Sequence, residues 1–342
     1  MPALRTEITE IVTGLAMFGY SDLVHALSIR PTALENVDEE VYDRLLGAYR
    51  SGNHMGEFHT AWVNGFRFAR SVEGLRGRPP WVVEWKGAHR PPGYEQIPAD
   101  LRVDHVFLIS CKYGSNILMN SSPGNLFDGT ATPDQDWFEE TAGAAYQDLY
   151  EICRPLVSGI SLPARVADLT RPDRMALKRQ LPRHLQGDAS AAYRAFTAEV
   201  ARASSERWQA AISSKRAQEE TVWRLLRLQS APYFVLGRSV TGQALAYRVK
   251  TPWDLRASHR FVSFRQWAVA DRGQPIVAFA AGFRNQLSGK LQAVEGHVEV
   301  RWSHGKFAQA PEAKVYLDTP HHEVPAYVPL EPARDDLTLF PG

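Results

Sequence analysis

The chain has 342 residues, of which 44% are hydrophobic and 23% are charged, and its formal net charge is +1. This composition is typical of a globular protein of two or three domains, and the near-zero charge neither favours nor excludes a nucleic-acid partner. The two cysteines, Cys111 and Cys153, are too few for a disulfide framework or a four-cysteine zinc site.

The sequence contains no segment typical of membrane insertion. No apolar stretch approaches the roughly 18 residues needed to span a bilayer, and the residues from Met1 to Glu7 lack the hydrophobic region of a signal peptide. We therefore expect a cytoplasmic protein without membrane contact.

Residues 5 to about 75 are predicted to be mostly helical. Apolar residues recur at helical spacing in two segments, which predicts that each helix buries one face. The two stripes are Ile8, Ile11, Val12 and Leu15, and Phe58, Trp62, Phe66 and Ala69.

Residues from about 80 to 128 change to a strand-like pattern. Trp81 to Trp85 and Val103 to Lys112 are rich in β-branched and aromatic residues, and a Pro/Gly-rich connection from Arg90 to Tyr94 separates them. This alternation of helix and strand indicates an α/β region in the first half of the chain.

The rest of the chain is predicted to be helical and then β-rich. Between residues 135 and 229, Tyr146, Leu149, Tyr150 and Cys153 form an apolar stripe, and after Tyr233 short apolar runs alternate with turn residues. We therefore expect an α/β domain over residues 1–130, a helical region over 131–230 and a β-rich recognition or assembly domain over 231–342.

One apolar run ends in a lysine. The residues from Val106 to Ile109 predict a strand that is buried on both faces, with Asp104 at its start and Ser110-Cys111-Lys112 at its end. A lysine at the rim of a sheet can hold a water or a phosphate beside a divalent cation.

This segment resembles the PD-(D/E)xK nuclease superfamily, whose hallmark is an Asp on one strand and an acidic or polar residue-x-Lys on the next. The matching residues are Asp104, or Asp100 just before it, and Ser110-Cys111-Lys112, with Ser110 standing where the family usually has Asp, Glu or Gln. The resemblance implies a restriction-endonuclease-like mixed sheet flanked by helices, followed by the helical connector and the β-rich C-terminal domain. It also implies a nuclease that depends on Mg²⁺ or Mn²⁺.

The acidic residues near this strand are the candidate metal ligands. Asp104 is the first choice, joined by the carbonyl oxygen of Cys111 and by Glu84 on the preceding strand, because Mg²⁺ prefers oxygen ligands. Glu57 is a further candidate, since its helix face with Ala61, Asn64 and Phe68 can point inward. The catalytic set is then Lys112, Asp104, Glu84 and Glu57, with Lys112 offsetting charge on the phosphate.

Each candidate also has a purely structural interpretation. Lys112 can be a solvated lysine at a strand end, and Glu84 can pair with Lys86 on the same strand face. Glu57 can be an acid favoured by the helix dipole, and Cys111 can be a small buried apolar residue.

Two further groups of residues are candidate nucleic-acid contacts. The polar segment after Lys112 offers Ser115, Asn116 and Asn120 to phosphate oxygens, unless it is an ordinary turn. Between Leu162 and Gln229 there are 13 Lys/Arg against 7 Asp/Glu, a surplus that fits a polyanion as well as solvated helices. The closely spaced Lys178, Arg179 and Arg183 are the cations predicted to bind nucleic acid.

These observations favour a metal-dependent nuclease that hydrolyses phosphodiester bonds, with DNA as the preferred substrate and a role in restriction or defence. The alternative is a non-catalytic nucleic-acid-binding or assembly protein with a degenerate nuclease fold, of which Ser110 is the trace. The sequence leaves open whether the chain forms a homodimer or binds a partner protein.

Overall fold

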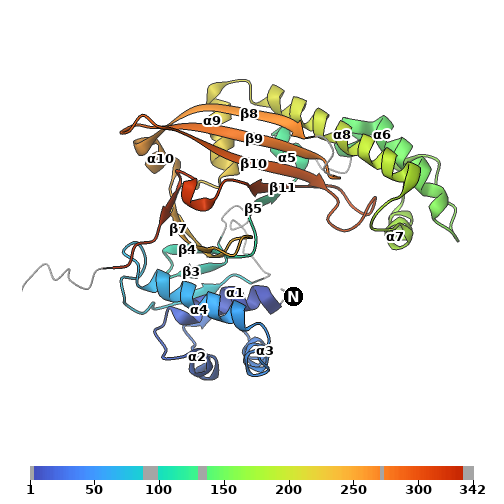
Figure 1. The fold of residues 1–342 in the computed structure, drawn as a ribbon. Helices are drawn as coiled ribbons and strands as arrows, with labels where there is room; N and C mark the ends of the chain where they lie inside the picture. The colour runs from blue at the N-terminus through green and yellow to red at the C-terminus, as the bar shows by residue number, and fades with distance from the viewer. Residues whose placement is uncertain (1–3, 88–98, 130–136, 270–272, 334–342) are drawn as a thin grey trace, which may run out of the picture. The chain divides into compact units, whose positions relative to one another are not determined.

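The computed structural model describes residues 4–87, 99–129, 137–269 and 273–333 (Figure 1). The predicted connection from Arg90 to Tyr94 lies outside this part of the chain. The chain forms two compact units, each assembled from separate segments. Unit 1 comprises Met1–Asn116, Arg227–Ser258 and His321–Gly342, and unit 2 comprises Ile117–Leu226 and His259–Pro320.

Unit 1 is built on a seven-stranded mixed sheet in the order β1-β2-β3-β4-β6-β7-β12. The pairs β1–β2 and β4–β6 are parallel, and the other neighbouring strands are antiparallel. The strands are β1 (Leu34–Glu35), β2 (Val83–Trp85), β3 (Leu101–Val103), β4 (Phe107–Tyr113), β6 (Tyr233–Arg238), β7 (Ala244–Val249) and β12 (Tyr327–Pro329).

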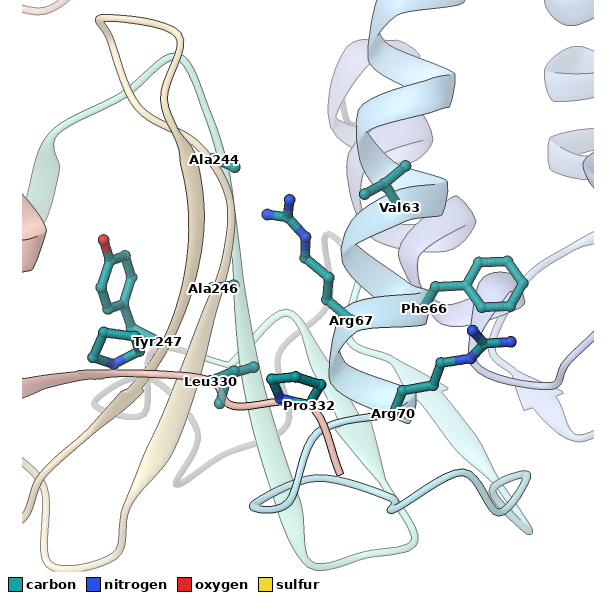
Figure 2. Close-up of a pocket in the computed structure, with 10 residues that line it drawn as sticks. Val63, Phe66, Arg67, Arg70, Ala244, Ala246, Tyr247, Leu330 and Pro332 are labelled. Atoms are coloured by element: carbon teal, nitrogen blue, oxygen red, sulfur yellow. The ribbon is translucent and has the colours of Figure 1, made fainter. Parts of the chain in front are cut away.

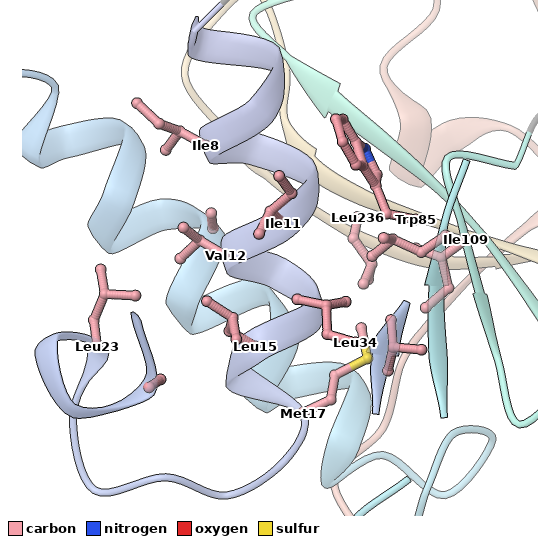
Figure 3. Packing of buried hydrophobic residues seen from close by; sticks show 14 of the residues in the cluster. Ile8, Ile11, Val12, Leu15, Met17, Leu23, Leu34, Trp85, Ile109 and Leu236 are labelled. Atoms are coloured by element: carbon pink, nitrogen blue, oxygen red, sulfur yellow. The ribbon is translucent and has the colours of Figure 1, made fainter. Parts of the chain in front are cut away.

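Helices α1 and α4 cover one face of this sheet, and α1 is buried along most of its length (Figures 1 and 3). The apolar residues of α1 pack against Val83, Leu101, Ile109 and Leu236 of the sheet, which buries the stripe that the helical spacing predicted. The helices of unit 1 are α1 (Leu4–Ala16), α2 (Leu23–Ile29), α3 (Glu39–Arg50), α4 (Met55–Ala69), α10 (Pro252–Ser258) and the 3₁₀ turn η4 (His321–Glu323).

Glycine allows α1 and α4 to approach each other closely. A Cβ at Gly65 of α4 would collide with the carbonyl oxygen of Thr13 and would lie 2.6 Å from the Cβ of Ala16. The Thr13 hydroxyl, which donates to Thr9 O at 2.6 Å, also lies 3.2 Å from Ala61 O of α4. The contact between the two helices therefore depends on a residue without a side chain.

Unit 2 contains a five-stranded antiparallel sheet in the order β5-β11-β10-β9-β8. Trp208 of α8 is fully buried and packs edge-on against Phe264 and Phe279 of the sheet. The elements are β5 (Ile117–Ser121), α5 (Pro123–Phe127), α6 (Trp137–Cys153), η2 (Arg154–Leu156), η3 (Val166–Asp168), α7 (Arg171–Gln180), α8 (Gly187–Ala211), α9 (Lys215–Leu225), β8 (His259–Val269), β9 (Ile276–Asn285), β10 (Leu291–Arg301) and β11 (Glu312–Leu317).

The mixed α/β architecture, with a second, antiparallel sheet, agrees with the α/β class expected from the sequence. The stripe of Tyr146, Leu149, Tyr150 and Cys153 is buried on α6 as predicted. The units interleave along the chain, whereas the sequence predicted three consecutive regions over 1–130, 131–230 and 231–342. No described helix is long and apolar enough to cross a membrane.

Candidate functional site

The predicted continuous strand from Val103 to Lys112 is two strands joined by a turn, which corrects the expectation from the apolar run. Asp104 and His105 have positive φ angles of 50° and 58°, and the Val106 N–H donates to Val103 O at 3.0 Å. Asp and His tolerate this left-handed conformation better than most residues. Val106 is 72% exposed, so the run is not buried on both faces.

The turn places Asp104 and Lys112 at opposite ends of β4. In the β3–β4 register Val103 lies opposite Phe107, and Lys112 lies five positions after Phe107 along β4, which is roughly 17 Å. The Asp104 carboxylate accepts the Trp81 N–H at 2.7 Å, and Arg78 Nη1 lies 2.6 Å from its other oxygen. The structure therefore gives Asp104 a role in anchoring the turn and does not bring it to Lys112.

Asp100, the second choice from the sequence, lies at the lysine end instead. Leu101 pairs with Ile109, so Asp100 comes level with Ser110. Its Oδ2 accepts the Cys111 N–H at 2.7 Å and lies 3.4 Å from Ser110 Oγ. Asp100 N–H also donates to Ile109 O at 2.7 Å. This network fixes a carboxylate beside the Ser110-Cys111-Lys112 segment.

Glu84 is held by cations of its own sheet. Its carboxylate contacts Lys86 Nζ at 3.3 Å, hydrogen-bonds to Arg102, and lies 3.4 Å from His105 Nδ1. Burial acts to raise the pKa of Glu84, but the hydrogen bonds from Arg102 and Lys86 and the positive charges of the same two residues together outweigh it, so the pKa lies below its ordinary value. The sequence had left two roles open for Glu84, a metal ligand or a partner of Lys86, and the ion pair with Lys86 is present in the structure.

Glu57 faces inward, as the helix face predicted, but it meets other partners than Asp104. The Tyr113 hydroxyl donates to Glu57 at 2.9 Å, and Arg5 Nε lies 3.4 Å away. Burial acts to raise the pKa of Glu57, but the hydrogen bonds from Tyr113, from the backbone and from His54, together with the charge of His54, outweigh it, so the pKa is lowered. Glu57 thus links the start of α4 to the end of β4.

Glu10 of α1 is an acid that the sequence reasoning missed. It is 9% exposed, and it accepts the Trp85 Nε1–H at 2.6 Å. Burial raises the pKa of the Cys111 thiol well above its ordinary value, and the negative charges of Asp100 and Glu10 raise it further. Both carboxylates therefore lie within electrostatic range of Cys111. No signal in the sequence marked Glu10, because Glu7 and Thr13, its neighbours one helical turn away, are polar as well.

The side chains at the end of β4 alternate between the two faces of the sheet. Cys111 lies opposite Leu236 of β6 and faces α1, where it interacts with Thr13, so Ser110 and Lys112 face the other way. Gly237 of β6 has φ 142°, and a Cβ there would collide with the Lys112 carbonyl oxygen. A larger residue at 237 would therefore displace the end of β4 that carries the lysine.

His321 is a buried group electrostatically coupled to Lys112. Its ring stacks on Tyr247, with centroids 6.0 Å apart, and packs at a tilt against Tyr327, with centroids 5.3 Å apart. Burial lowers the pKa of His321 to about 4, and the positive charge of Lys112 contributes to the shift. The folded protein therefore holds this imidazole neutral at pH values where an unfolded chain, with a histidine pKa near 6.5, would protonate it.

This difference predicts acid sensitivity. Because the unfolded state binds more protons between about pH 6.5 and 4, the contribution of His321 is complete above that range and falls through it as the pH is lowered, by on the order of 3 kcal/mol. Urea unfolding at pH 7 and pH 4.5 should show a smaller loss of stability for His321→Gln than for the wild type. His322→Gln, at an exposed neighbour, should behave like the wild type. Equal losses in all three proteins would contradict the assignment.

The predicted nucleic-acid contacts divide between the units. Ser115 and Asn116 follow β4 in unit 1, whereas Asn120 belongs to unit 2, within β5, opposite Lys314. The predicted loop after Lys112 is therefore partly a strand. In unit 2, Lys178 and Arg179 lie in the last turn of α7 and Arg183 follows it, all exposed.

Unit 1 also contains a cavity of about 590 Å³ that the sequence did not predict (Figure 2). Arg67 reaches from α4 toward Ala244 and Ala246 of β7, and Arg70 lies near Pro332. None of the residues predicted as site residues is among the described residues that line this cavity. We assign it no catalytic role.

The described residues contain no group of three or more His, Cys, Asp or Glu side chains that could hold a metal ion. Comparison of the chain with family models, with curated proteins and with solved structures finds no match. The interpretation of the site therefore depends on its own geometry.

Proposed function

We propose that the protein hydrolyses phosphodiester bonds in nucleic acid, with Asp100 and Lys112 as its catalytic pair. The observation that supports this most is the β3–β4 register, which sets the Asp100 carboxylate against Ser110 and Cys111, next to Lys112. An Asp at one strand and a polar residue-x-Lys on the next is the arrangement of the PD-(D/E)xK superfamily, with Asp100 in place of Asp104. A restriction-endonuclease-like sheet in unit 1 is part of this proposal.

The residues at this end of the sheet fit a hard divalent cation. Asp100 offers carboxylate oxygens, and the Cys111 carbonyl is a further oxygen donor; Mg²⁺ commonly takes one or two carboxylates and completes its coordination with waters and substrate phosphate oxygens. When bound, Mg²⁺ or Mn²⁺ would activate water and neutralise charge on the phosphate. DNA remains the preferred substrate.

The chain's own groups have distinct roles in this proposal. The Lys112 ammonium stabilises negative charge on the phosphate as water adds to phosphorus and the ester oxygen leaves with a proton. The Cys111 N–H and Ser110 hydroxyl hold one oxygen of Asp100 and so orient its carboxylate. Gly237 keeps β6 close to β4 without displacing Lys112.

The direct test is cleavage of plasmid DNA with Mg²⁺, Mn²⁺ or EDTA. The wild type should cleave with either metal and stop with EDTA, and Lys112→Met should be slower by roughly 100-fold, as for loss of one charge-stabilising donor. Methionine keeps most of the aliphatic stem, so folding should be unaffected. Lys290→Ala, at an exposed lysine of unit 2, is the control and should cleave normally. A wild-type rate in Lys112→Met would refute the proposed role of the lysine.

A second candidate function is nucleic-acid binding without catalysis. The observation that favours it is the engagement of Glu84 by Arg102 and Lys86, together with a serine at the position where the family usually has an acid. In that case the wild type should shift the mobility of DNA in a gel-shift assay, and plasmid DNA should stay uncleaved with both Mg²⁺ and Mn²⁺.

A further inference from the structure

Unit 2 contains a polar cavity of about 490 Å³ beside the predicted nucleic-acid-binding cations. Its walls come from α7 and the segment after it, from α8, and from the connection between β10 and β11. The described lining residues are Leu177, Lys178, Leu181, Pro182, Arg183, Tyr193, Gln274, Arg301, Trp302, Ser303, His304, Gly305 and Lys306.

The charges that line this cavity are positive. Lys178 and Arg183 are exposed, and no described acid forms an ion pair with either of them. Arg301 is partly balanced, since its Nη1 lies 3.1 Å from Glu299 Oε2. None of the described residues that line the cavity is acidic. The cavity therefore carries a surplus of positive charge.

The cavity wall is held in place by backbone contacts. Lys306 Nζ donates to Arg183 O at 2.7 Å and to Pro182 O at 3.3 Å, and it lies over the Tyr193 ring. Gly305 has φ 109°, and a Cβ there would lie 3.1 Å from Lys178 Cγ. The connection between β10 and β11 thus fixes both the segment after α7 and the stem of Lys178.

Aromatic side chains on the core side of the cavity pack against the connection between β10 and β11. Trp302 stacks on Phe196 of α8 with centroids 5.6 Å apart and meets Phe307 at 5.3 Å. Tyr193, on the same helix, hydrogen-bonds to Gln274 at 3.3 Å. These contacts join the cavity to the core of unit 2, so its shape does not depend on exposed side chains alone.

We propose that this cavity binds the phosphate group of a nucleotide or of a nucleic-acid end. A phosphate monoester carries a charge near −2 at neutral pH, so it balances several cations better than a carboxylate, which carries a charge of −1. Arginine and lysine are the usual ligands of phosphate groups. The volume lies in the ordinary range for small-molecule sites. Gln274 and Tyr193 supply neutral polar groups for a sugar or base, whereas the Ser303 hydroxyl already donates to the Glu312 carboxylate. This binding does not depend on hydrolysis in unit 1.

The test is calorimetric titration of the full chain with adenosine monophosphate, inorganic phosphate and adenosine. We expect adenosine monophosphate to bind, phosphate to bind more weakly, and adenosine to give no measurable heat. The double variant Lys178→Gln/Arg183→Gln should bind adenosine monophosphate at least about tenfold more weakly, since charge-assisted hydrogen bonds to the phosphate are lost. The control Arg165→Gln/Arg171→Gln removes two exposed cations, one before α7 and one at its start, that do not line the cavity and should bind like the wild type.

Oligonucleotides distinguish the two sources of phosphate. A 5′-phosphorylated strand that binds more tightly than its 5′-hydroxyl twin supports a nucleic-acid end, and equal binding of the strands together with tight adenosine monophosphate binding supports a free nucleotide. If both double variants bound the phosphate probes equally more weakly than the wild type, the binding would come from diffuse surface charge, and the proposal would be overturned. So would the absence of binding by every phosphate probe. All variants change exposed side chains, and circular dichroism should show wild-type melting.

Discussion

Asp100→Asn should reduce metal-dependent cleavage by at least roughly 100-fold, because it replaces a charged ligand for a hard cation with a neutral amide. The Asn side chain keeps an oxygen that can accept the Cys111 N–H, so the β3–β4 register should survive the change. Initial rates of plasmid cleavage at saturating Mg²⁺ are the measurement.

Asp104→Asn is the matched control, since it makes the same chemical change four residues away. Asparagine is well suited to the positive φ of Asp104, and its amide oxygen can still accept the Trp81 N–H. We expect near-normal cleavage. If Asp104→Asn lost activity while Asp100→Asn kept it, the site would lie at the turn end of β4, as the apolar run first indicated.

Gly65→Ala should destabilise the fold by about 3 kcal/mol, because overpacking at a close helix contact forces the backbones apart. The added methyl group would meet the Thr13 carbonyl oxygen directly, and a backbone atom cannot move aside as a flexible side chain can. Urea unfolding followed by circular dichroism measures the change.

Gly56 provides the control on the same helix. A Cβ at Gly56 meets no atom within 4 Å, so Gly56→Ala, in the first turn of α4, should stabilise the helix by at most about 0.5–1 kcal/mol, the propensity difference for a helix interior. The unfolding midpoints should therefore rank Gly56→Ala above the wild type and the wild type above Gly65→Ala. A Gly65→Ala midpoint at or above the wild type would contradict the α1–α4 packing.

Local patterns in the sequence predicted where helices and strands lie better than which strands pair with one another. The helical stripes on α1 and α6 and the strand that ends at Lys112 follow from the spacing of apolar residues along one segment. The pairing of β4 with β6 joins segments more than 100 residues apart. Periodicity carries no information about such a partner, so the sequence assigned β6 and β7 to a separate C-terminal domain.

The candidate site was predicted in part. Lys112 lies at the end of a strand, and Asp100 was the second of two acids considered beside it. The choice between them depended on a turn at Asp104 and His105, where neither glycine nor Asn-Gly marks the reversal. Glu10 was missed because helix periodicity identifies the buried face without saying which polar residue on it meets a strand.

Manganese binding followed by electron paramagnetic resonance tests the central claim most directly, because it locates the ion without reference to substrate or rate. We expect the wild type and Asp104→Asn to bind Mn²⁺ with the same affinity, and Asp100→Asn to bind it at least about tenfold more weakly. Unchanged affinity in Asp100→Asn, with a loss in Asp104→Asn, would contradict the assignment of the site to the Asp100–Lys112 end of β4.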